Sequence, residues 1–288
     1  MRLDHVTLLC FFASYLTALV LEVAQLRREG RGKRWVALAF IAAGLVAHTA
    51  YLLNRSRDSH LPPLLSSAHD WLLVLSWLTV VLLLSVLVWN RHLGIGLFAL
   101  PPVVLMVGAA RFANQQRVFD TVDLYGLRML HASLWVLGIA GVMVSFVLSL
   151  MYLAQHRRLK LKRLEPGELQ LFSLERLGRW NWWGVVSSVP LLTLAMITGV
   201  LLVVWSRSDH PVTFLQSGFL LTGIVWLGMA ILFGWLLTAR QPGGRNVAWR
   251  TMWACGLLLT LLLAQQLFTS GGIHGQSADR PAEEGARS

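Results

Sequence analysis

The stretch HASLWVLGIAGVMVSFVLSLMYLAQ (residues 131–155) decides the fold, because it contains no Asp, Glu, Lys or Arg over its whole length. A helix needs about 20 mostly apolar residues to cross the hydrocarbon core of a bilayer. The stretch is continuously apolar, whereas a strand of a membrane barrel alternates apolar and polar residues. It therefore predicts a transmembrane helix.

Seven more runs of the same kind occur, at about residues 5–26, 35–53, 71–90, 94–112, 183–205, 215–239 and 251–269. The composition agrees, since 56% of the 288 residues are hydrophobic and 14% are charged. We expect an all-α fold, a polytopic transmembrane bundle with eight spans. It would occupy residues 1–270, and the polar tail 271–288 is expected to be external and largely disordered.

Basic residues predict how the bundle is oriented. The loops 27–34, 91–93, 156–182 and 240–250 hold sixteen of the 25 Lys and Arg residues. Cytoplasmic loops are rich in Lys and Arg, so both termini are expected outside. The same rule accounts for the net charge of +11, and no nucleic-acid partner is expected. The first span ends in a basic cluster and lacks a small-residue cleavage site, so we expect it to be retained.

Seven of the nine histidines are predicted at or near the outer surface. His48 lies within the second span, about 8 Å below its outer end at ~1.5 Å per residue. An ionisable side chain in a span usually faces a cavity or a partner. His48 is therefore either a neutral histidine bonded to a neighbouring helix or a ligand of a metal or haem. The other six are His5, His60, His69, His131, His210 and His274.

No catalytic constellation is found in the sequence: HExxH, a Gly-rich phosphate loop and a carboxylate pair at useful spacing are all missing. Glu22, near the inner end of the first span, is expected to reach the interface. Cys10 and Cys255 lie in spans and are expected to be packing residues. Five aspartates are expected to be solvated in external loops, namely Asp58, Asp70, Asp120, Asp123 and Asp209.

Several segments share features with one family. SHLPPLLSSAHDWLLVLSW (59–77) opens a span with His, Pro and a Ser-Trp, and residues 130–163 form a His-led helix running into a basic loop. Residues 173–202 lead from a short amphipathic segment into a Leu- and Thr-rich span that ends near Thr-Gly. An Arg- and Gly-rich turn (235–249) and GGIHG (271–275) follow. Together they resemble the membrane cytochrome c assembly proteins, in particular their eight-span CcsA-, HemX- and YpjD-like branch.

The resemblance implies a haem site. The family's external axial ligands match His131 and His274, and its second-span histidine matches His48. Two neutral imidazoles hold haem b without covalent attachment. His48 would be a deeper ligand or access site, and His60 and His210 are further candidates on the outer side.

The resemblance also implies a function, with two marked departures. The tryptophan-rich WGxxWxWD loop of haem-handling members is replaced by SRSDHPVTFLQ (206–216), and Thr238 stands where a membrane-embedded histidine is expected. These losses argue against a haem–cytochrome c ligase. They favour a haem-binding or haem-handling protein of cytochrome c biogenesis in a bacterial plasma membrane, acting with another assembly subunit.

An alternative function comes from HemX- and YpjD-type relatives. On this interpretation the chain is a regulatory or accessory membrane subunit, controlling tetrapyrrole synthesis or metal-ion efflux without stable haem. A cytoplasmic partner would then dock on loop 156–182, although ordinary positive-inside topology also explains that loop. A small-solute transporter is less favoured, because no internal repeat is found.

Overall fold

A computed structural model describes residues 7–25, 31–59, 62–89, 94–113, 115, 124–161, 171–205, 223–224, 226–231, 234–235 and 244–268. All regular secondary structure in these ranges is helical. The prediction of an all-α fold is confirmed for this part of the chain. The helices are α1 (Leu8–Gln25), α2 (Arg31–Ser59), α3 (Pro63–Ser66), α4 (Ala68–Trp89), α5 (Gly96–Ala110), α6 (Tyr125–Lys160), α7 (Leu174–Trp205) and α9 (Arg245–Phe268).

Six of these helices are long and apolar enough to cross a membrane, namely α1, α2, α4, α6, α7 and α9. A multi-pass membrane protein is the architecture that fits them. Helix α5 is apolar but has 15 residues, about 22 Å at ~1.5 Å per residue, shorter than the hydrocarbon core. The predicted span 215–239 lies mostly outside the described residues, which include short helical pieces of it between 223 and 235.

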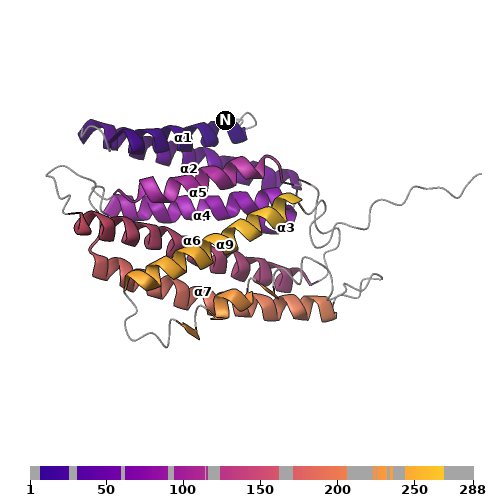
Figure 1. The fold of residues 1–288 in the computed structure, drawn as a ribbon. Coiled ribbons are helices and arrows are strands. Elements are labelled where there is room, and N and C mark those ends of the chain that lie inside the picture. The colour runs from indigo at the N-terminus through magenta and orange to yellow at the C-terminus, as the bar shows by residue number, and fades with distance from the viewer. Residues whose placement is uncertain are drawn as a thin grey trace, which may run out of the picture.

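The long helices from α1 to α7 lie side by side and alternate in direction along the chain, whereas α9 crosses them obliquely (Figure 1). Helix α1 contacts α2 and α5, α4 contacts α2 and α5, and α6 contacts α4, α7 and α9. The ends of α2 and α5 and the starts of α4 and α6 therefore meet at the end of the bundle where α3 lies, on the right in Figure 1. We call this the α3 end. The opposite end, where Arg34, Arg157 and Arg179 lie, is called the basic end.

Glycines allow α6 and α7 to approach closely. A Cβ added to Gly138 would lie 2.7 Å from the Leu192 side chain, and one added to Gly141 would collide with Ser188. Small residues drive such packing in membranes because they let two helix backbones come together. The close contact between α6 and α7 also places His131 of α6 against α7.

Several helices extend beyond their predicted apolar runs. Helix α2 ends at Ser59 instead of 53, α6 begins at Tyr125 instead of 131, and α7 begins at Leu174 instead of 183. The predicted loop 156–182 is thereby shortened, since α6 continues to Lys160. Polar turns continue these helices past the hydrocarbon core, where hydrophobicity carries no signal.

Candidate functional site

His131 lies on α6 and bonds to the backbone of α7. Its Nδ1 is 2.8 Å from the carbonyl oxygen of Ala195 and 3.2 Å from the hydroxyl of Thr198. A carbonyl oxygen only accepts, so Nδ1 carries the proton and donates it. In the neutral ring the lone pair is then on Nε2, which makes no hydrogen bond to the described residues. Such a bond at one nitrogen orients an imidazole for ligation through the other.

The residues after Ala195 shape a niche for this ring. The Thr198 hydroxyl is 2.9 Å from the carbonyl oxygens of both Leu194 and Ala195, to which it can donate. A Cβ added to Gly199 would lie 2.9 Å from Cε1 of His131. The imidazole thus occupies space that any other residue at position 199 would fill. Thr198 and Gly199, the Thr-Gly pair noted in the sequence, therefore bond to the His131 ring and leave room for it.

The sequence predicted that His131 is the first residue of its helix, and this prediction is wrong. Helix α6 begins at Tyr125, so His131 lies about 9 Å further along the axis at ~1.5 Å per residue. Its ring is partly buried against α7 instead of lying at a free helix end.

His48 is buried between α2 and α1, as its place within a span predicted. The ring is fully buried and stacks on Phe11, with ring centroids 4.3 Å apart and an interplanar angle of 6°. Nδ1 is 3.3 Å from the Tyr15 hydroxyl. Nε2 is also buried and has no hydrogen-bond partner among the residues that the structure describes. Helix α2 continues to Ser59, so His48 lies about 16 Å from the end of the helix at ~1.5 Å per residue.

The structure does not bring all the candidate ligands together. His131 lies between α6 and α7, whereas His48 lies between α1 and α2. His274, His60 and His210 fall outside the described ranges, so the pairing of His131 with His274 stays a prediction. Within those ranges no group of three or more His, Cys, Asp and Glu residues is placed to hold a metal ion.

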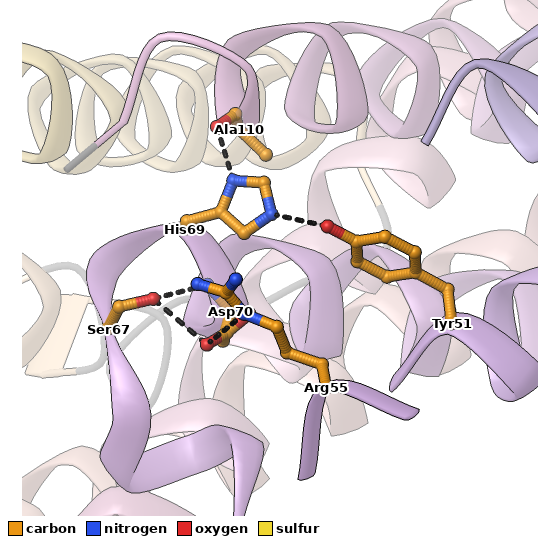
Figure 2. Close-up of polar contacts among 6 residues, drawn as sticks. All are labelled: Tyr51, Arg55, Ser67, His69, Asp70 and Ala110. Carbon is orange, nitrogen blue, oxygen red and sulfur yellow. Dashed lines mark hydrogen bonds and ion pairs between the residues drawn. The ribbon is translucent and has the colours of Figure 1, made fainter. Parts of the chain in front are cut away.

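A buried polar network at the α3 end was missed by the sequence analysis (Figure 2). The Asp70 carboxylate is fully buried, so the prediction that it is solvated in a loop is wrong. Its oxygens accept hydrogen bonds from Nε of Arg55 at 3.0 and 3.3 Å and from the hydroxyl of Ser67 at 3.0 Å. The Ser67 oxygen accepts in turn from the Asp70 backbone N–H. This Ser-x-x-Asp pattern caps the first turn of α4 and was the available signal.

His69, the neighbour of Asp70, has both ring nitrogens engaged. Nδ1 donates to the carbonyl oxygen of Ala110 at 2.6 Å, and Nε2, 3.2 Å from the Tyr51 hydroxyl, accepts from it. The residue is 1% exposed, so it is buried inside the α3 end of the bundle. Without a free lone pair, His69 joins α2, α4 and α5 as a structural residue.

Glu22 also differs from its prediction. It is 3% exposed and packs at the start of α5, where a Cβ on Gly96 would lie 3.0 Å from its carboxyl group. It therefore points into the bundle instead of reaching the interface. Of the two cysteines predicted to be packing residues, Cys255 is buried and Cys10 is exposed.

No family model, no curated protein and no solved structure matches the chain. The resemblance to the cytochrome c assembly proteins thus rests on the sequence segments quoted above.

Proposed function

We propose that the chain is a haem-binding or haem-handling membrane protein of the cytochrome c assembly superfamily. The observation that supports this most is the His131 niche, because a proton fixed on Nδ1 leaves Nε2 ready to ligate. Gly199 keeps the space around the ring clear. Haem b, when bound, would supply an iron atom that binds imidazole nitrogens.

Each histidine would have its own role in this function. His131 would be one axial ligand, oriented by Ala195 and Thr198. His274 would be the second, carried by the glycine-rich segment GGIHG. The unpartnered Nε2 of buried His48 fits a deeper ligand or access site. The missing tryptophan-rich loop favours binding or transfer over a ligase activity.

The same proposal includes the topology. Eight spans would place both termini outside a bacterial plasma membrane, with the α3 end external. The alternating direction of α1 to α7 in Figure 1 and the described basic residues in the opposite end turns of α2, α6, α7 and α9 support this arrangement. A reporter active only in the cytoplasm, fused after Ser288, should stay silent. An active reporter would show that the C-terminus lies in the cytoplasm and that the proposed orientation is wrong.

The haem proposal is tested by the absorption spectrum of the purified protein, expressed with haem available. We expect a Soret band of a six-coordinate low-spin species. His274→Ala should abolish or convert this species, whereas His156→Ala, a histidine at the basic end of α6, should leave it unchanged. His48→Ala should lower the haem content without changing the coordination type. A protein with no Soret band would contradict haem binding and leave the regulatory or accessory role as the better account.

A further inference from the structure

The guanidinium group of Arg55 is held in one orientation at the α3 end (Figure 2). Its Nε donates to both oxygens of Asp70, and the Arg55 side chain is 29% exposed while that of Asp70 is fully buried. The carboxylate is itself fixed by Ser67 at the start of α4. Arg55 therefore has less freedom than an ordinary arginine at a membrane surface.

Most of the donors of Arg55 remain available. Nε is the nitrogen that Asp70 uses, and the two terminal nitrogens make no hydrogen bond to the described residues. A planar guanidinium presents its terminal N–H groups in a geometry that matches two oxygens of one phosphate or carboxylate. The orientation set by Asp70 leaves this edge for another group.

A second cation lies close by. Arg111 follows the end of α5 directly after Ala110, whose carbonyl oxygen accepts from His69, and it is exposed. The side chains of Tyr51 and His69 connect the two arginines, because Tyr51 lies one turn before Arg55 on α2 and bonds to His69, which bonds to the residue before Arg111. Arg55 and Arg111 therefore lie at the same end of the bundle, and among the described residues only Arg55 forms an ion pair with Asp70. The excess positive charge favours an anion.

We propose that Arg55 and Arg111 form an anion-binding site for a phosphate group at the α3 end, with Asp70 as its positioning residue. The phosphate could belong to a phospholipid headgroup or to a free phosphate compound, since the donor geometry is the same for both. The site uses none of the candidate haem ligands and does not depend on the proposed function.

Binding is tested on the purified full-length chain with two probes. Phosphatidylglycerol retention is measured by native mass spectrometry, and inorganic phosphate affinity by titration calorimetry. Arg55→Gln should weaken binding on the order of tenfold, the scale of a lost charge-assisted hydrogen bond. Arg57→Gln is the matched control, because Arg57 is exposed on the same helix. Loss of lipid alone identifies a headgroup site, and loss of both ligands identifies a site for free phosphate.

A second pair of variants separates binding from folding. Arg111→Gln does not touch Asp70, so it should weaken binding while leaving thermal unfolding unchanged. Asp70→Asn should weaken binding even though both arginines remain, because Arg55 is no longer oriented. Equal binding by the wild type, Arg111→Gln and Arg57→Gln would overturn the proposal. The same conclusion would follow if neither probe bound to the wild type.

Discussion

Two histidines near the α3 end show how one residue type serves two purposes. His69 is held at both nitrogens, by the Ala110 carbonyl and the Tyr51 hydroxyl, and is almost completely buried. His131 is held at Nδ1 alone and is partly exposed. The first ring can only connect helices, whereas the second keeps a lone pair for a ligand. The number of engaged ring nitrogens, and not the presence of a histidine, distinguishes a structural residue from a candidate ligand.

The largest effect on stability is expected at the network around His69. Asp70→Ala leaves Arg55 without its carboxylate and the Ser67 hydroxyl without its acceptor. Removing one partner of a buried ion pair costs about 3 kcal/mol, and the partial exposure of Arg55 keeps the cost from being higher. Thermal unfolding in detergent, followed by circular dichroism, measures it. Asp58→Ala, exposed on α2, is the control and should unfold like the wild type. Unchanged unfolding of Asp70→Ala would show that the network carries little stability.

A smaller loss is expected for His69→Leu. The substitution leaves the Ala110 carbonyl and the Tyr51 hydroxyl without the partner they have in the wild type. Unpaired buried polar groups cost about 1–3 kcal/mol. The Soret band should keep its shape and intensity per protein, because His69 has no free lone pair. A changed spectrum in folded protein would place His69 among the ligands and remove the contrast with His131.

Gly199→Ala tests the niche around His131, the second of the two histidines compared above. The new Cβ would lie 2.9 Å from Cε1 of His131, so the ring must move, at a cost of about 1 kcal/mol or more. We expect haem content to fall more than stability does. Gly126→Ala, on the same helix as His131 with nothing within 4 Å of the added Cβ, should have neither effect. Equal haem content in the two variants would mean that the niche does not position the ring.

The smallest effect is expected for Tyr15→Phe. It removes the hydroxyl 3.3 Å from Nδ1 of His48 while keeping the aromatic ring. The substitution leaves the buried Nδ1 of His48 unpaired, and because the 3.3 Å contact is long we expect a loss of about 1 kcal/mol, the lower end of the range for such a group. Denaturant unfolding monitored by circular dichroism checks it. A change well above that size would show that the hydroxyl holds His48 more strongly than the geometry indicates.

Six of the eight apolar runs correspond to helices long enough to cross a membrane, but the runs did not predict where these helices end. An apolar run stops at the first charged residue, so the runs did not predict the turn with Arg128 before His131 or the polar turn with Arg55 after His48. Burial of His48 was predictable from its place within a run. Its contact with Tyr15 was not, because it depends on how two helices are aligned against each other. Asp70 was misplaced for the same reason, since its partner Arg55 is on another helix.

Cavity complementation at His131 tests the central claim most directly. His131→Gly removes the ring and leaves a space bordered by Thr198 and Gly199, into which free imidazole can diffuse. We predict that the variant loses the six-coordinate low-spin spectrum and regains it when imidazole is added, whereas His69→Gly shows neither change. A wild-type spectrum in His131→Gly without imidazole would contradict the assignment of His131 as a haem ligand.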